Sequence, residues 1–215
     1  TSVDPFAFGC LAQSANLRLV DGLVSAPGLI ICNDGILSGD GIVSASTLDG
    51  GLVSPGSSAG ELAINGNLTQ TASGALLIQL GGLEAGVEFD RVAVSGLASL
   101  GGALHVELIN GFVPVWSDTV GVLVAGDTTG SFATTSVPTL PLTLFIDPQI
   151  SASGVLLKVR AIGDINDDGV VDGADLAILL GSWGPCPGCP GDLNGDGVVD
   201  GIDIAILLGA WGPVP

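Results

Sequence analysis

The sequence contains no methionine, no tyrosine and only one histidine among its 215 residues. Basic residues are also scarce: Arg18, Arg91, Lys158 and Arg160 stand against 22 acids, which gives a formal net charge of −18. Proteins that bind nucleic acids do so largely through many lysine and arginine contacts to phosphate. We therefore expect no nucleic-acid partner.

Long apolar runs are missing too, although 47% of the residues are hydrophobic. Gly, Ser, Asn and Asp interrupt every stretch before it reaches the roughly 18 residues that a membrane helix needs. We therefore expect no membrane insertion. A chain that begins at Thr1 without any methionine is also expected to have been processed, most simply by removal of a signal peptide. This predicts a secreted protein that is extracellular or held at the cell surface.

The four cysteines form an even number, and an exported protein is expected to oxidise them. The sequence Cys186-Pro-Gly-Cys189 lacks the second CxxC, the nearby histidine and the strand–helix context of zinc and redox motifs. We predict a short Cys186–Cys189 disulfide and, as a second bridge, Cys10–Cys32.

From about Asn16 to Val159 the chain alternates apolar and polar residues in short segments that Gly pairs and Asn/Asp-Gly turns separate. This pattern predicts a mainly β body over residues 1–162. The turn signals at Asn33–Gly35, Gly39–Gly41 and Asp49–Gly51 lie too close together for long hairpins, as in the stacked rungs of a β-solenoid. Because the period is irregular, a β-sandwich remains the alternative. The predicted strands are Leu17–Leu23, Leu29–Cys32, Glu61–Ile64, Ala75–Leu80, Arg91–Val94, Ala103–Leu108, Val120–Val124, Leu142–Ile146 and Val155–Val159.

Gly- and Asn-rich patterns recur between about residues 50 and 160. They include the stretches Pro55 to Thr69, Val94 to Leu97, Leu100 to Val106 and Ile109 to Phe112. These stretches resemble the β-helical passenger repeats of autotransporter-type bacterial surface proteins. The resemblance implies a scaffold rather than a catalyst.

Residues 163–215 carry nine of the acids, all aspartates, and no basic residue. Within them, residues 163–185 align on 191–213 at an offset of 28, with 18 of 23 positions identical. Each copy opens with a twelve-residue loop whose oxygen ligands occupy the positions that an EF-hand loop uses for Ca²⁺, with glycine at position six. The sequence therefore predicts two Ca²⁺ ions. The predicted ligands are Asp164, Asn166, Asp168, Val170 (carbonyl), Asp172 and Asp175 in the first loop, and Asp192, Asn194, Asp196, Val198 (carbonyl), Asp200 and Asp203 in the second.

Aspartate rather than glutamate stands at position twelve, and the residues before each loop are too few for an entering helix. In both respects residues 163–215 resemble a type I dockerin. The resemblance implies a small α module of two calcium loop–helix repeats, with a cohesin as partner. The family commonly recognises cohesins through hydroxyl residues at loop positions ten and eleven and basic residues on the helix. Here those positions are Gly173-Ala174 and Gly201-Ile202, so conventional cohesin docking is not favoured.

A short helix is expected after each loop. The apolar positions of the two helices predict a small core between them rather than a partner site. These positions are Leu176, Leu179, Leu180 and Trp183, and then Ile204, Leu207, Leu208 and Trp211. Val171 and Val199, at position eight of the loops, are predicted to pair with each other as a short β-bridge.

We expect no enzyme. His105 lies in an alternating segment that predicts a surface-facing structural role. The only glutamates are Glu61, Glu84, Glu88 and Glu107, and although a glycosidase pair among them is compatible with the usual separations, the body has a single tryptophan and no tyrosine to line a sugar cleft.

The function predicted from the sequence is that of a calcium-stabilised extracellular structural protein that assembles with copies of itself into a surface layer or fibre. The alternative is a dockerin-bearing surface protein that binds a cohesin-like partner or a polysaccharide.

Overall fold

The computed structural model describes residues 16–141 and 143–214. Strands account for 51% of the described residues and two helices for 9%, so the predicted mainly β fold is confirmed. Neither helix of the described residues is long and apolar enough to cross a membrane. In chain order the elements are β1 (Asn16–Ser25), β2 (Leu29–Ile31), β3 (Ile36–Ser44), β4 (Thr47–Asp49), β5 (Leu52–Pro55), β6 (Glu61–Ile64), β7 (Leu68–Gln70), β8 (Ala75–Leu80), β9 (Arg91–Leu100), β10 (Ala103–Leu108), β11 (Thr119–Gly130), β12 (Thr134–Ser136), β13 (Leu144–Ser151), β14 (Gly154–Ala161), β15 (Val170–Val171), α1 (Gly173–Gly181), β16 (Gly184–Pro185), β17 (Val198–Val199), α2 (Gly201–Gly209) and β18 (Gly212–Pro213).

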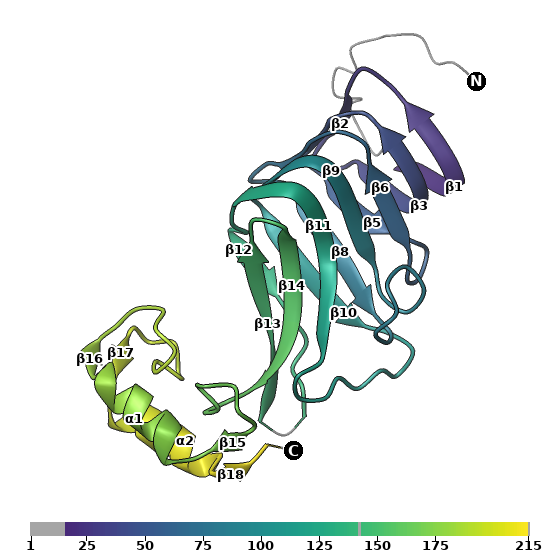
Figure 1. Cartoon of the computed structure of the whole chain (residues 1–215). Coiled ribbons are helices and arrows are strands. Elements are labelled where there is room, and N and C mark those ends of the chain that lie inside the picture. The colour runs from purple at the N-terminus through teal and green to yellow at the C-terminus, as the bar shows by residue number, and fades with distance from the viewer. Residues whose placement is uncertain (1–15, 142, 215) are drawn as a thin grey trace. The chain divides into compact units, whose positions relative to one another are not determined.

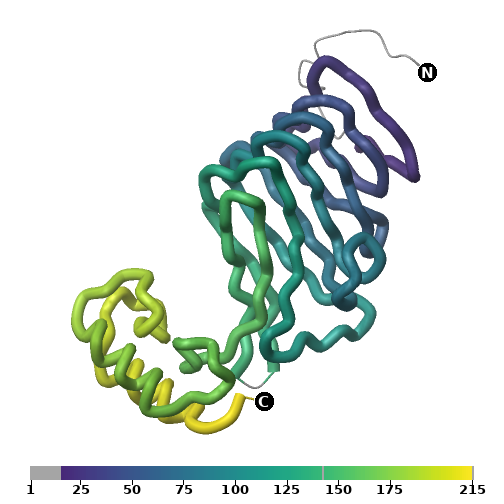
Figure 2. The backbone as a smooth tube through the Cα atoms, in the orientation of Figure 1, coloured from purple at the N-terminus to yellow at the C-terminus, as the bar shows by residue number. Residues whose placement is uncertain are grey.

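Strands that are one turn of the chain apart pair in parallel (Figure 1). One series runs from β1 through β3, β6 and β9 to β11, a second from β5 through β8 and β10 to β12, and a third from β2 through β4 and β7 to β9. Figure 2 shows the successive turns lying against one another. Hydrogen bonds between neighbouring turns span 21 residues from Asp40 to Glu61 but 30 from Gly60 to Asp90. The turns therefore lengthen along the chain, which explains the irregular period of the sequence.

The alternation of side chains along these strands builds the interior. Along β8, Leu76, Ile78 and Leu80 are at most 3% exposed, and intermediate residues separate them. Parallel pairing in register then stacks buried residues of successive turns, as when Leu62 pairs with Val92. Successive residues of a strand point to opposite faces, so this register keeps one apolar interior through all the turns.

The predicted turn at Gly39–Gly41 is wrong, because these residues lie inside β3. Gly39 and Gly41 have φ of +93° and +148°, and the register with β1 shifts at this point. A Cβ atom at Gly39 would overlap the carbonyl oxygen of Leu19. The two glycines therefore serve a bulge and a close approach of the neighbouring turn.

Predicted strands over β6, β8 and β10 have the same bounds in the structure. Sequence patterns did not predict β3, β4, β5, β7 and β12, and most of these strands have only three or four residues. Such segments are too short for an alternating pattern to stand out. The predicted strand Leu142–Ile146 begins at a residue outside the described ones, and the observed strand β13 begins at Leu144.

The predicted disulfide between Cys186 and Cys189 is confirmed. Cys32 is also disulfide-bonded, and Cys10, the other end of the second predicted bridge, lies outside the described residues.

Contacts divide the chain into two compact units. The second unit comprises Pro114–Asp118, Thr139–Asp147 and Lys158–Pro215, and the first comprises the rest. Both tails of the β13–β14 pair, Leu144–Asp147 and Lys158–Ala161, thus group with the acidic repeats. The proposed domain boundary between residues 162 and 163 stays a prediction.

Candidate metal centre

A helix follows each acidic loop, and the loop's own carboxylates begin it. Asp172 caps α1 by accepting a hydrogen bond from the N–H of Ala174 at 2.7 Å. Asp175 returns the contact by accepting from the N–H of Asp172 at 2.9 Å. This reciprocal capping box, here with two aspartates, satisfies N–H groups that a helix start leaves free. Loop positions nine and twelve therefore also fix where α1 starts.

The same carboxylates close the first loop on itself. Asp164 accepts hydrogen bonds from the N–H groups of Asp168 and Gly169, each at 3.1 Å. The other oxygen of Asp175 accepts from the two N–H groups that follow Asp164, at 2.8 and 3.1 Å. Asp164 and Asp175 are 2% and 0% exposed. Positions one and twelve of the loop are thus both buried and turned inward.

The second loop repeats this arrangement. Asp192 accepts from the N–H groups of Asp196 and Gly197 at 3.1 and 2.9 Å, and Asp203 accepts from Leu193 and Asp200 at 2.8 Å each. Burial, the largest single influence, raises the pKa of Asp203, but the main-chain N–H groups that it faces together lower that pKa below its usual range. Asp203 is therefore a carboxylate at neutral pH, as a calcium ligand must be.

The side chains of positions three and five also pair within each loop. Asn166 donates from Nδ2 to Asp168 at 2.8 Å, and Asn194 donates to Asp196 at 2.9 Å. Position six has φ of +89° at Gly169 and +88° at Gly197, a conformation that side chains rarely adopt.

All twelve predicted ligands lie in these two loops, and their donor atoms are oxygens throughout. Hard oxygens from carboxylates, an amide and a main-chain carbonyl are the ligands that Ca²⁺ prefers. Among the described residues, no three His, Cys, Asp or Glu side chains gather into a metal-binding group. The donor chemistry and the turn at position six fit calcium, and the two ions remain a prediction.

The predicted bridge between Val171 and Val199 is wrong. Instead β15 in the first loop pairs with β18, which follows α2, and β17 in the second loop pairs with β16, which follows α1. Each loop is thus paired with the segment that ends the other repeat. The main-chain groups that a bridge between the loops would need are already used by these two pairings.

Only one residue of each four-residue apolar stripe is buried, and Leu176 and Ile204 are partly buried against it. Leu179 and Leu207 are 0% exposed and form a core with Val171 and Val199. The outer residues of the stripes, predicted as core, lie open instead: Leu180, Trp183, Leu208 and Trp211 are 49%, 56%, 52% and 50% exposed. A stripe of residues at helical spacing is wide, and one neighbouring helix covers only its inner edge.

This division of the stripe predicts unequal effects for neighbouring leucines. Leu179→Ala is expected to destabilise the second unit by about 2 to 5 kcal/mol, because it leaves a cavity in a small core. Leu180→Ala is expected to cost less than about 0.5 kcal/mol, because its side chain is half exposed. All three tryptophans lie in the second unit, so urea unfolding followed by tryptophan fluorescence measures both variants. Equal effects would contradict the burial described here.

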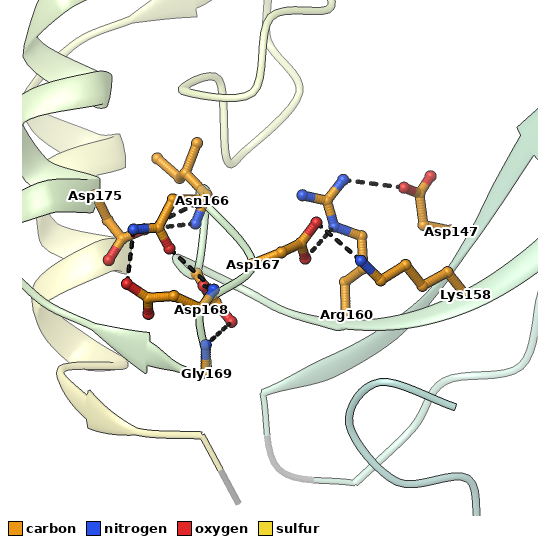
Figure 3. A network of polar contacts seen from close by, with 10 residues as sticks. Asp147, Lys158, Arg160, Asn166, Asp167, Asp168, Gly169 and Asp175 are labelled. Atoms are coloured by element: carbon orange, nitrogen blue, oxygen red, sulfur yellow. Dashed lines mark hydrogen bonds and ion pairs between the residues drawn. The ribbon is translucent and has the colours of Figure 1, made fainter. Parts of the chain in front are cut away.

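Four charged residues in and beside the first loop form ion pairs that the sequence did not predict (Figure 3). Asp167 lies between Lys158 and Arg160, with each nitrogen–oxygen distance 3.0 Å, and Arg160 also reaches Asp147 at 3.2 Å. The chain has only four basic residues, and two of them, spaced by one residue, stand just before the loop. That placement was the signal available in the sequence.

Comparison with known proteins gives no family for this chain. No protein-family model matches the sequence, and no curated protein matches it either. The case for calcium therefore depends on the chain's own residues, and the likeness to dockerins remains a resemblance.

Proposed function

We propose that residues 163–215 are a duplicated calcium module, and that the protein is a non-enzymatic, calcium-stabilised structural protein that is secreted and works outside the cell. One observation carries the proposal: two loops 28 residues apart have the same hydrogen bonds at positions one, three, five, nine and twelve. In each loop these bonds hold the carboxylates of positions one and twelve against the loop's own main chain, where a cation would bind.

Calcium would have a structural task in this module. Its fully buried apolar core consists of four side chains, which is little to hold about 50 residues together. Eight aspartates among the predicted ligands repel one another when no cation lies between them. Binding of Ca²⁺ removes that repulsion, so its binding energy becomes folding energy.

The body is proposed to be a β-solenoid. Support comes from the three parallel series of strands and from the stacked turns. A sandwich of two antiparallel sheets would need hairpin pairings between consecutive strands. In the ladders from β1 to β12, each strand instead pairs with one from the next turn.

Self-association is supported by an apolar row on the outer face of the first unit. Parallel register aligns Leu23, Ile42, Ala63, Ala93 and Val124 across β1, β3, β6, β9 and β11. The three larger side chains are 66%, 40% and 45% exposed. Contiguous exposed apolar surface of this kind often marks an interface. We therefore propose assembly of like chains into a layer or fibre.

The alternative function, attachment to a cohesin-like partner or a polysaccharide, is favoured by a different surface. Four of the eight side chains predicted as core are instead half exposed: Leu180 and Leu208 in the helices, and Trp183 and Trp211 two residues beyond the helix ends. Tryptophans at such positions are common at the centre of interfaces.

Sedimentation velocity of the full chain tests the proposal. With millimolar Ca²⁺ we expect species larger than a monomer whose proportion rises with protein concentration. The double variant Leu23→Ser/Val124→Ser is expected to remain monomeric, whereas Trp183→Ser/Trp211→Ser should still assemble. A wild-type chain that stays monomeric at every concentration would reject self-assembly. If the tryptophan variant alone prevents assembly, the exposed surface around Trp183 and Trp211 rather than the sheet forms the interface.

A further inference from the structure

The two calcium loops differ in one charged residue. Residues 163–185 and 191–213 differ at only five aligned positions. Asp167, which aligns with Gly195, is the single difference in charge. Both residues have positive φ, +59° and +74°. Glycine adopts this conformation freely, whereas an aspartate there is less common. The first loop thus keeps a residue that its own backbone does not favour.

The contacts of Asp167 offset that cost. Its two carboxylate oxygens each accept a bond of 3.0 Å, one from Lys158 Nζ and one from Arg160 Nε (Figure 3). Arg160 also donates to Asp147 at 3.2 Å. The four side chains are between 21% and 30% exposed, so water screens these pairs only in part. The pairs tie the first loop to the second half of β14, and Arg160 links β14 in turn to Asp147 of β13.

A second contact reaches the same loop from another segment. The ring of Trp116 lies so close to Gly169 that an added Cβ would stand 2.9 Å from one ring carbon. At Gly197, the matching glycine, the nearest atom is Pro187 Cβ at 3.9 Å. The buried Nε1 of Trp116 has no hydrogen-bond partner among the described atoms, so packing rather than polar bonding holds this ring.

We propose that the first loop is a calcium-dependent latch: Ca²⁺ bound there holds Asp167 on Lys158 and Arg160 and holds Gly169 on Trp116. This inference rests on the proposed calcium function. Without the ion, the four ligand aspartates of the loop repel and the loop opens. Because Asp167 and Gly169 lie inside that loop, opening it moves both off their partners.

Coupling of this kind acts in both directions. If Ca²⁺ favours the latched state, the latch favours Ca²⁺ by the same factor. Among the described residues, the ion pairs of Lys158 and Arg160 with the loops go to Asp167 of the first loop and none goes to the second, so the ion of the second loop is not held by the latch. We therefore expect the two sites to respond differently to changes at Lys158 and Arg160.

A purely electrostatic role for Asp167 predicts the opposite result. Lys158 and Arg160 carry positive charge close to the first loop, and on charge alone their removal strengthens the binding of a cation. On the latch proposal, their removal weakens binding at the first loop, because the loop loses its anchor. The double variant Lys158→Gln/Arg160→Gln therefore separates the two explanations by sign.

The experiment uses the full chain with Trp183→Phe and Trp211→Phe, so that Trp116 is the only tryptophan. Calorimetric titration with CaCl₂ counts the ions, and Trp116 emission follows the first loop. We expect two ions, with the emission change accompanying one of them. Lys158→Gln/Arg160→Gln and Asp167→Asn should each weaken that phase about tenfold and leave the other unchanged. Arg18→Gln is the remote control for loss of a positive charge, and neither phase should shift.

Stronger binding in the lysine–arginine variant, or an equal shift of both phases, overturns the latch while two bound ions uphold the calcium function. Titration without any bound Ca²⁺ overturns the calcium function itself.

Discussion

Chelating calcium from the full chain is expected to unfold residues 163–215 and to leave the strands of the first unit folded. The module's buried core is four side chains, and the charges of eight aspartates oppose its folding without a cation. A ligand present at 100 times its dissociation constant stabilises the folded state by about 2.7 kcal/mol per site, so two sites lose roughly 5 kcal/mol on chelation. That is comparable to the whole stability of a small domain.

Hydrogen exchange measured by mass spectrometry, with Ca²⁺ or with EGTA, resolves the two units by peptide. Losing several kcal/mol of stability corresponds to exchange that is faster by a factor of 100 or more. Peptides from α1 and α2 are therefore expected to lose protection in EGTA by at least that factor. Peptides from β6 to β10 should be unaffected, because their core is formed by the stacked turns. The variant Asp175→Asn/Asp203→Asn should behave in Ca²⁺ as the wild type does in EGTA. Full protection of the helices in EGTA would contradict the proposal.

Raising the pH from 4 to 8 is expected to destabilise the first unit, through two buried carboxyl groups. Asp49 and Asp90 are 1% and 0% exposed. Burial, the largest cause, raises the pKa of each to about 7, and main-chain hydrogen bonds from Gly51 to Asp49 and from Gln79 and Gly60 to Asp90 offset part of that rise. In the unfolded chain each pKa is near 3.8.

The sign follows from which state holds the proton. Below pH 3.8 both states are protonated and the stabilisation is complete. Between about pH 4 and 7 only the unfolded chain ionises, so stability falls until the folded carboxyls also ionise near 7. Each unit of pKa difference corresponds to about 1.4 kcal/mol, which puts the loss at up to roughly 4 kcal/mol for each group.

Urea unfolding followed by the strand signal in far-UV circular dichroism measures this dependence, since the tryptophans report only the second unit. Asp49→Asn keeps an oxygen to accept from Gly51, whose N–H lies 3.0 Å from the carboxylate, but cannot ionise. It is expected to flatten the pH profile by about half. Asp34→Asn, at an exposed turn, is the matched control and should follow the wild type. A wild-type stability that rises between pH 4 and 7 would rule out this role for the two groups.

Local patterns in the sequence were enough to predict several elements. Glu61–Ile64, Ala75–Leu80 and Ala103–Leu108 alternate clearly, and the structure has strands with those bounds. The duplicated loops predicted the start of a helix after each, because the spacing of aspartates at positions nine and twelve also makes a capping box. Glycine is typical of both turns and β-bulges, so Gly39 and Gly41 led to the wrong prediction of a turn.

Thus the sequence by itself determined the mainly β class, the repeat of 28 residues and the oxygen-bearing side chains at fixed loop positions, since all of these depend on residues close together in the chain. Tertiary structure alone decided which residue of each apolar stripe is buried, that each loop pairs with the end of the other repeat, and that Asp167 meets Lys158 and Arg160. Those outcomes depend on which segments meet in space. No local pattern of spacing or charge contains that information, because contact between distant segments is set by the packing of the whole unit.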